Sequence, residues 1–387
     1  MQRKENGWKK WRGGWMLLVC ACIVMLVPGM TVQAKSKNQG KAGKNITWTY
    51  QPNKKTLTLS GKGYVSISGL RTWNDDDEQV WLGKEDGNLP MFQKIIFQEG
   101  ITEIDCRFFY LENVKSISLP KSLQKIRYCG ESLLSGVNGS FDPWGSAFRT
   151  IRVAKQNKKF KVSGGALVSK DGKTLYLVPS GKSMEKYRIS GKVTQIANYA
   201  FWGTDIRRVV LGKQVTTIGN AAFKHSTVKE VKFNSKLKRI NYCAFDSCGL
   251  TEVKFPNSLS VIGECAFYGC PLTEVVIPAK VSKIQYEAFG KNHKLEKIVI
   301  QGNTAIEEEA FFDTTFYKDS KKNIINQPIT VVLGKKMKAS VSDLCADLGS
   351  QIQFQVDPGN TKYYLKEKDL YAIRGDVLVY QYQKEME

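Results

Sequence analysis

Four cysteines stand at a spacing that could bring thiols together. Cys243 and Cys265 are 22 positions apart, and so are Cys248 and Cys270. Steps of 22 residues from the second pair give a series of residues that can hydrogen-bond to nearby backbone at a turn: Thr204, Ser226, Cys248, Cys270, Asn292 and Thr314. This series predicts a structural role for the two cysteines. A Cys248–Cys270 disulfide is the alternative, because neighbouring strands lie about 4.8 Å apart and that spacing is compatible with a disulfide.

Patterns typical of an enzyme or a metal site are sparse. The chain has two histidines, His225 and His293, and neither has a nucleophile motif around it. The G-x-S-x-G, Walker A and H-E-x-x-H motifs do not occur. A zinc site lacks a C-x-x-C pair, and the acidic run at 75–78 lacks the spaced ligands of a calcium loop. We therefore expect no catalytic residue, no metal and no cofactor, with a Cys–His hydrolase as the remaining catalytic alternative.

Basic residues give the clearest indication of a ligand. The 387 residues include 58 Lys and Arg against 36 Asp and Glu, a formal charge of +22. Between Arg149 and Lys192 there are 12 basic residues and two acidic ones. This stretch predicts attraction of an anionic polymer, such as a cell-wall polymer or a sulfated or sialylated glycan. An equally weighted explanation for the excess of basic residues is that lysine keeps the exported solenoid soluble. Four of these lysines form what we call the basic block: Lys155, Lys158, Lys159 and Lys161. A second, smaller concentration comprises Lys318, Lys321, Lys322, Lys335, Lys336 and Lys338.

The elements that would position these residues follow from an internal repeat. Phenylalanine recurs every 22 residues, alanine precedes each phenylalanine, and isoleucine stands five positions before it. One coil of 22 residues cannot bury its own apolar side, so agreement at three positions in six units predicts a stacked array. The repeating phenylalanines are Phe201, Phe223, Phe245, Phe267, Phe289 and Phe311.

Each unit also contains a predicted strand, clearest at 250–256. Val253 and Phe255 alternate with Glu252 and Lys254, which is the period of a strand with one buried face. The predicted fold is a β-rich repeat solenoid, with parallel strands stacked in 22-residue coils, a β-hairpin cap and insertions. The outward strand positions would form a concave face of the kind that solenoids use for recognition. We call it the strand face, and its candidate binding residues are Arg208, Glu230, Lys232, Glu252, Lys254 and Glu274.

The pattern L-x-x-V-x-[FI]-P-x-x-[VL]-x-x-I-x-x-x-A-F, complete at 250–267, resembles the BspA-like leucine-rich repeats of bacterial surface proteins. The resemblance covers Phe92 to about Leu333 and includes an earlier copy at 101–109. The segments 46–50 and 56–61 are similar to the hairpin that opens many such proteins. The resemblance implies a leucine-rich-repeat fold and a surface or secreted protein with roles in adhesion or host interaction.

Flanking segments complete the predicted organisation. Residues 1–34 have the layout of a secretory signal peptide, with cleavage expected after Ala34. A basic linker at 35–45, a hairpin cap at 46–90, a solenoid at 91–333 and a C-terminal β unit or cap at 334–387 follow. The solenoid is interrupted by an irregular insertion and hairpin at 127–190. Part of this hairpin recurs at the C-terminus with an offset of 203: Phe160, Leu167, Gly172 and Leu175 match Tyr363, Leu370, Gly375 and Leu378.

These observations favour a non-catalytic binding or adhesion protein, secreted or associated with the bacterial surface, that recognises a protein or a glycan. The alternative is a structural cell-envelope component held electrostatically to anionic wall polymers. Nucleic acid is a disfavoured partner, because export and the lack of interleaved aromatic platforms argue against it. No transmembrane segment is expected in the mature chain.

Overall fold

The computed structural model describes residues 38–73, 79–81, 92–111, 113–128, 147–314, 316–318, 324–326, 328–349 and 352–381. The chain divides into two units, Met1–Ser36 and Lys37–Glu387, and all of these residues belong to the second. The predicted signal peptide and its cleavage site, the acidic run at 75–78 and most of the insertion after Arg127 lie outside the described residues.

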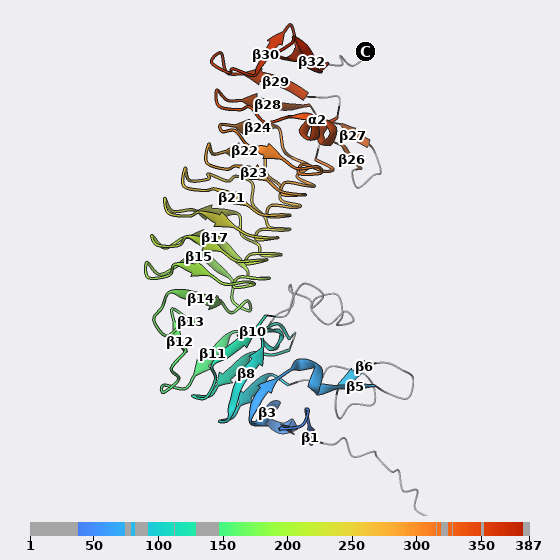
Figure 1. Cartoon of the computed structure of the whole chain (residues 1–387). Helices are drawn as coiled ribbons and strands as arrows, with labels where there is room; N and C mark the ends of the chain where they lie inside the picture. The colour runs from blue at the N-terminus through green and yellow to red at the C-terminus, as the bar shows by residue number, and fades with distance from the viewer. Residues whose placement is uncertain are drawn as a thin grey trace, which may run out of the picture. The chain divides into compact units, whose positions relative to one another are not determined.

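The regular coils stack through two ladders of parallel strands (Figure 1). Neighbouring strands in each ladder come from successive coils and pair in register, as Ile196, Ile218 and Ile240 do. The first ladder contains β15 (Met184–Arg188), β17 (Ile206–Val210), β19 (Glu230–Lys232), β22 (Glu274–Ile277), β24 (Lys297–Ile300), β28 (Ile329–Leu333) and β29 (Ile352–Val356). The second contains β16 (Gln195–Ile196), β18 (Thr217–Ile218), β20 (Arg239–Ile240), β21 (Val261–Ile262), β23 (Lys283–Ile284) and β25 (Ala305–Ile306).

The prediction of a strand at 250–256 is wrong. This coil contributes one isolated bridge, Glu252 to Glu274, and the first ladder is interrupted there. The rings of Phe233 and Phe255, in adjacent coils, stack with their centroids 6.0 Å apart. That separation is larger than the 4.4–5.5 Å between successive rings of the repeating phenylalanines, and the first ladder is interrupted at the same coil. Val253 is nevertheless buried, as its pattern predicts.

A third side of each coil is the turn that carries the Ala-Phe pair. Residues two before and two after the phenylalanine have left-handed backbone, as at Cys243 (φ 49°) and Ser247 (φ 55°). This conformation is costly for residues other than glycine. Backbone hydrogen bonds to the next coil offset the cost, with the Phe245 N–H donating to Ala266 O at 2.8 Å. Stacking thus fixes a turn that one coil would not hold alone.

The repeating phenylalanines form a continuous stack inside the coils, as predicted. All six are fully buried, and the ring centroids of successive pairs lie 4.4, 4.8, 5.2, 5.5 and 5.4 Å apart. The planes of each pair are within 14° of parallel. The array therefore shares one apolar interior that no single coil possesses.

An N-terminal part of the same unit has its own apolar cluster. The predicted hairpin is present as β2 (Ile46–Gln51) and β3 (Thr56–Gly61), and Gln39–Lys41, within the range predicted as a linker, forms β1 beside it. The order β1-β2-β3 continues through β7 (Lys94–Phe97), β9 (Ser116–Leu119) and β11 (Thr150–Val153). A second sheet joins β4 (Gly63–Val65), β8 (Ile101–Asp105) and β10 (Lys125–Arg127), and β5 (Arg71–Trp73) pairs with β6 (Gln79–Trp81).

Two antiparallel three-stranded units have the same boundaries shifted by 203 residues. We call them the internal meander and the terminal meander. The first consists of β12 (Phe160–Ser163), β13 (Ala166–Ser169) and β14 (Thr174–Leu177), and the second of β30 (Tyr363–Lys366), β31 (Asp369–Ala372) and β32 (Val377–Tyr380). Before the terminal meander lie a hairpin of β26 (Phe316–Lys318) and β27 (Ile324–Asn326) and the helix α2 (Ser342–Leu348). Within the described residues, no helix is long and apolar enough to cross a membrane.

Candidate ligand-binding surfaces

The strand face presents the side chains that the repeat predicts to point outward. Its six candidate residues are all exposed. Ion pairs connect neighbouring coils along this face, with Arg208 Nε 2.9 Å from Glu230 Oε2 and Lys297 Nζ 3.1 Å from Glu274 Oε1. Exposed pairs of this kind contribute about 0–1 kcal/mol each. Much of the charge on the strand face is thus already matched within the protein.

The second outward column of the strand face is mixed. Lys232 and Lys254 are exposed, whereas Val210, Val276 and Val299 are half-buried. In register, Val210 lies opposite Lys232 and Val276 opposite Val299. This column offers short aliphatic surface between lysines, without an aromatic cluster of the kind that dominates tight protein interfaces.

The structure brings the basic block together on and just before the internal meander. Lys155, Lys158 and Lys159 are exposed in the segment that leads into β12, and Lys161 lies on β12 itself. Lys161 Nζ donates to Lys170 O at 2.7 Å, so the residue that follows β13 joins the same surface. Beside it is a cavity of ≈ 290 Å³ lined by Gln124, Lys158, Lys159, Phe160, Ser169, Lys170, Asp171 and Tyr176.

Asp171 is the one carboxylate among the described residues that line this cavity, and it is held in its ionised form. Asp171 Oδ1 accepts hydrogen bonds from Ser169 Oγ at 2.6 Å and from the Lys173 N–H at 2.9 Å. The Ser169 hydrogen bond, followed by that from Lys173 and the charges of Lys173 and Lys161, lowers the pKa of Asp171. Among the described residues no ion pair joins a lysine of the basic block to a carboxylate. The surface therefore keeps a positive excess that faces solvent.

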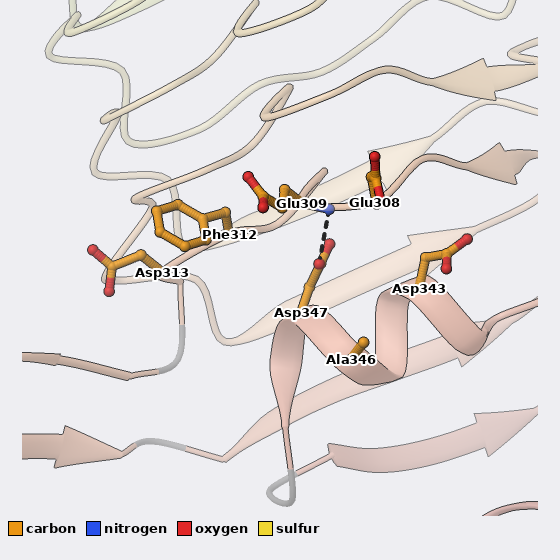
Figure 2. A pocket seen from close by; sticks show the side chains of 7 residues that line it. All are labelled: Glu308, Glu309, Phe312, Asp313, Asp343, Ala346 and Asp347. Atoms are coloured by element: carbon orange, nitrogen blue, oxygen red, sulfur yellow. Dashed lines mark hydrogen bonds between the residues drawn. The ribbon is translucent and has the colours of Figure 1, made fainter.

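A second pocket has the opposite charge. It lies between the last Ala-Phe turn and α2, and five carboxylates surround a volume of ≈ 510 Å³ together with Phe312 and Ala346 (Figure 2). The five are Glu308, Glu309, Asp313, Asp343 and Asp347. Burial, and next the nearby charges of Asp343 and Glu309, raise the pKa of Asp347 to about 6. Sequence analysis did not identify this pocket.

Asp347 has a structural role that explains its position. In earlier coils the N–H of the phenylalanine donates to the next coil, as Phe289 does to Ala310 O at 2.8 Å. At the last turn the acceptor is the carboxylate of Asp347. Its Oδ1 accepts a hydrogen bond from the Glu309 N–H at 2.9 Å and its Oδ2 accepts one from the Phe311 N–H at 3.0 Å. One carboxylate thus replaces two backbone carbonyls of a further coil and ends this ladder.

The series of residues at 22-residue steps from Thr204 to Thr314 lines the turns as predicted. The alternative, a Cys248–Cys270 disulfide, is not formed. Cys248 and Cys270 are free thiols. Their Sγ atoms donate instead to the preceding coil, to Phe223 O at 2.9 Å and Phe245 O at 3.1 Å. Asn292 uses the same geometry with Phe267 O at 2.8 Å. Each side chain satisfies a buried carbonyl, so the cysteines act here as hydrogen-bond donors.

We predict that Cys248→Ser changes the free energy of unfolding by less than about 1 kcal/mol, because the hydroxyl keeps the donor. Cys248→Ala should cost about 1–2 kcal/mol, since it leaves a small void and removes a buried hydrogen bond. Urea denaturation of the two variants measures the difference. Equal destabilisation by both variants would show that the hydrogen bond contributes nothing.

The two histidines lie in different coils, and the Cys265 thiol of the other cysteine pair is held protonated. His225 and His293 lie half-buried in turns of different coils, and burial lowers the pKa of both. A hydrogen bond with Cys243 is the main cause that raises the pKa of the Cys265 thiol, followed by burial. A thiol held protonated is a poor nucleophile. No group of three or more His, Cys, Asp or Glu in the described part of the chain could hold a metal ion.

The repeat geometry agrees with a known family. The sequence matches the model described as the BspA type leucine rich repeat region, in six copies over residues 88–130, 179–228 and 216–327. The chain is a BspA-type leucine-rich-repeat protein. No curated protein sequence matches the chain.

Solved structures similar to this BspA-type protein include three bacterial ones. The pneumococcal vaccine antigen PcpA is 16% identical with a TM-score of 0.42, covering 81% of this chain and 98% of its own. A leucine-rich repeat protein from Bacteroides ovatus is 15% identical with a TM-score of 0.35, covering 82% and 80%. The leucine-rich repeat protein of T. pallidum is 20% identical with a TM-score of 0.34, covering 53% and 99%.

Two buried asparagines are further residues that sequence analysis missed. Asn157 and Asn360 precede the two meanders and again differ by 203 positions. Asn157 Nδ2 donates to Pro120 O and Leu123 O, and Asn360 Nδ2 donates to Gly334 O and Met337 O in the same way. The shared sequence N-x-K followed by an aromatic residue is the signal that could have found them.

Proposed function

We propose that this protein is an exported, non-catalytic binding protein that holds an anionic polymer or glycan at or outside the bacterial surface. The single observation that carries the proposal is the surface of the basic block, where Lys158, Lys159 and Lys170 line one cavity and no ion pair joins these lysines to a carboxylate among the described residues. A chain of negative charges could lie across these ammonium groups, with individual acidic groups seated against Lys158, Lys159 and Lys170.

The basic block is a better candidate for this ligand than the strand face. Arg208 and Lys297 on the strand face are already paired with glutamates of neighbouring coils, so a ligand must compete with those pairs. Lys161 and Lys170 donate hydrogen bonds to backbone carbonyls, which orients the two side chains, and no ion pair joins either of them to a carboxylate among the described residues. Strand-face binding of a protein remains a separate expectation from the repeat pattern.

Export and the absence of catalysis are parts of the same proposal. Export rests on the signal-peptide layout at 1–34 and on the family. A non-catalytic role is supported by the raised pKa of the Cys265 thiol and by the separation of the histidines into different coils. The protein would then act by holding its ligand in place.

We predict that replacing Lys155, Lys158, Lys159 and Lys161 by glutamine lowers the salt concentration at which the protein elutes from a sulfated-polysaccharide resin. The matched control replaces four exposed lysines of the solenoid by glutamine, with the same change in net charge: Lys213, Lys229, Lys236 and Lys238. The control should elute near the wild type. Equal shifts for both variants, or no retention of the wild type, contradict a localised site.

The same lysines support a structural role in the cell envelope, held by charge to anionic wall polymer. The two roles differ in salt dependence, because the screening length falls to about 3 Å in 1 M salt. A protein held by charge alone should be stripped from cells by high salt. A protein bound to a specific receptor should remain attached under the same wash.

A further inference from the structure

The cavity beside the basic block has a chemically mixed lining. Three lysines line it, at positions 158, 159 and 170, and we call them the cavity lysines. The cavity also contains the carboxylate of Asp171, the amide of Gln124 and the half-buried ring of Tyr176. Its volume of ≈ 290 Å³ lies at the small end of the about 300–1,000 Å³ that is typical of ligand pockets. The cavity therefore suits one small unit of a ligand that combines negative charge, hydrogen-bond donors and an apolar face.

Asp171 restricts which kind of anion fits. Its Oδ1 accepts hydrogen bonds from Ser169 Oγ and the Lys173 N–H, whereas Oδ2 accepts none from the described residues. The residue is exposed, so Oδ2 is open to a hydrogen-bond donor from a ligand. A chain of phosphates offers acceptor oxygens, which an ionised carboxylate repels. A sugar offers hydroxyl donors to the same oxygen.

The ring of Tyr176 gives the cavity an apolar wall. Tyr176 lies on β14 and packs edge-on against the buried ring of Phe160, with the two centroids 5.2 Å apart. This contact holds the tyrosine ring while the residue stays partly open to solvent. An aromatic ring has an apolar body beside its polar tip, so the C–H face of a sugar ring can pack against it. A phosphate chain has no such face.

The terminal meander shows that the fold does not require this lining. The two meanders share the preceding asparagine and the aromatic residue three positions after it, but the cavity positions differ. The equivalents of Lys158, Lys170, Asp171 and Tyr176 are Thr361, Ile373, Arg374 and Val379. A cavity of ≈ 300 Å³ also lies beside the terminal meander, and no lysine is among the described residues that line it. The lining of the first cavity is therefore a property of the site and not of the scaffold.

We propose that the cavity beside the basic block binds one acidic sugar unit of a glycan, a sugar ring that carries a carboxylate or a sulfate. This inference rests on the proposed function and narrows its ligand from anionic polymers in general to glycans. The acidic group lies against the cavity lysines, a ring hydroxyl donates to Asp171 Oδ2, and the C–H face of the sugar packs on Tyr176. The other lysines of the basic block attract further charges of the glycan outside the cavity.

The test measures the affinity of the protein for polygalacturonate, dextran sulfate and inorganic polyphosphate by titration calorimetry, at equal ionic strength and equal concentration of polymer charge. The two polysaccharides distinguish a carboxylate from a sulfate as the acidic group. The reference value is the ratio of the affinity for the tighter polysaccharide to the affinity for polyphosphate. A change in the net charge of the protein acts on both polymers and cancels in this ratio.

Asp171→Asn is expected to lower the ratio roughly fivefold, because the sugar hydroxyl exchanges a charged acceptor for a neutral one and polyphosphate loses a repelling group. The matched control is Glu185→Gln, which makes the same change in net charge at an exposed position of β15 outside the cavity lining. The control should leave the ratio at the wild-type value.

Tyr176→Val installs the residue that the terminal meander has at this position, so it suits the strand and should leave thermal unfolding close to that of the wild type. It is expected to weaken polysaccharide binding roughly fivefold and to leave polyphosphate binding unchanged. A ratio that stays at the wild-type value in either variant overturns the sugar site and leaves the proposed function standing. A wild type that binds none of the three polymers overturns both.

Discussion

Replacing Phe245 by alanine is expected to lower the free energy of unfolding by about 3–5 kcal/mol, the usual cost of removing a fully buried aromatic ring. Phe245 stacks on Phe223 at 4.8 Å and on Phe267 at 5.2 Å, and Phe233 packs against its edge at 6.0 Å. The substitution therefore opens a void that is shared by three coils. Equilibrium denaturation in urea measures the loss.

Phe312→Ala is the matched control for this prediction. Phe312 directly follows Phe311, but the residue is 41% exposed and is not one of the repeating phenylalanines that stack inside the coils. Removing it should change the free energy of unfolding by less than about 0.5 kcal/mol. If the two alanine variants lost stability equally, the shared interior would not be what holds the coils together.

The shared interior is also the part of the fold that the sequence predicts best. A column such as Ile196, Ile218 and Ile240 specifies register directly, because one stacked coil places each residue beside its equivalent 22 positions away. Sequence therefore predicts which residues are buried. It does not predict where a ladder breaks, since the separation between Phe233 and Phe255 depends on how two bulky side chains pack in three dimensions.

The two candidate sites also differ in how far the sequence predicts them. The basic block is dense in sequence and becomes one surface because β12 and β13 are adjacent strands of one meander. The acidic pocket is built from two segments that are 30 or more positions apart, one on the last turn and one on α2. Its key residue, Asp347, belongs to no repeat column, and only the position of α2 against the final turn reveals what it does.

We expect Asp347→Ala to lower the free energy of unfolding by about 2 kcal/mol at neutral pH, because the N–H groups of Glu309 and Phe311 lose their acceptor. The end of the array should loosen before the rest, so hydrogen exchange of these two amides is the most direct measurement. Asp343→Ala is the control: Asp343 lies exposed on the same helix and lines the same pocket. Its replacement should leave both amides protected.

Asp347 should also give the protein a pH dependence of defined sign. Its pKa is raised from 3.8 to about 6 in the folded state, so the folded protein binds this proton more tightly than the unfolded chain does. The associated stability is fully present below pH 3.8 and is lost as the pH rises to about 6. The difference in unfolding free energy between the wild type and Asp347→Ala should therefore shrink across this interval, and titrating groups that do not interact with Asp347 cancel in the difference. A difference that grew with rising pH would mean that the two amide hydrogen bonds outweigh burial and the neighbouring carboxylates in setting the charge state of Asp347.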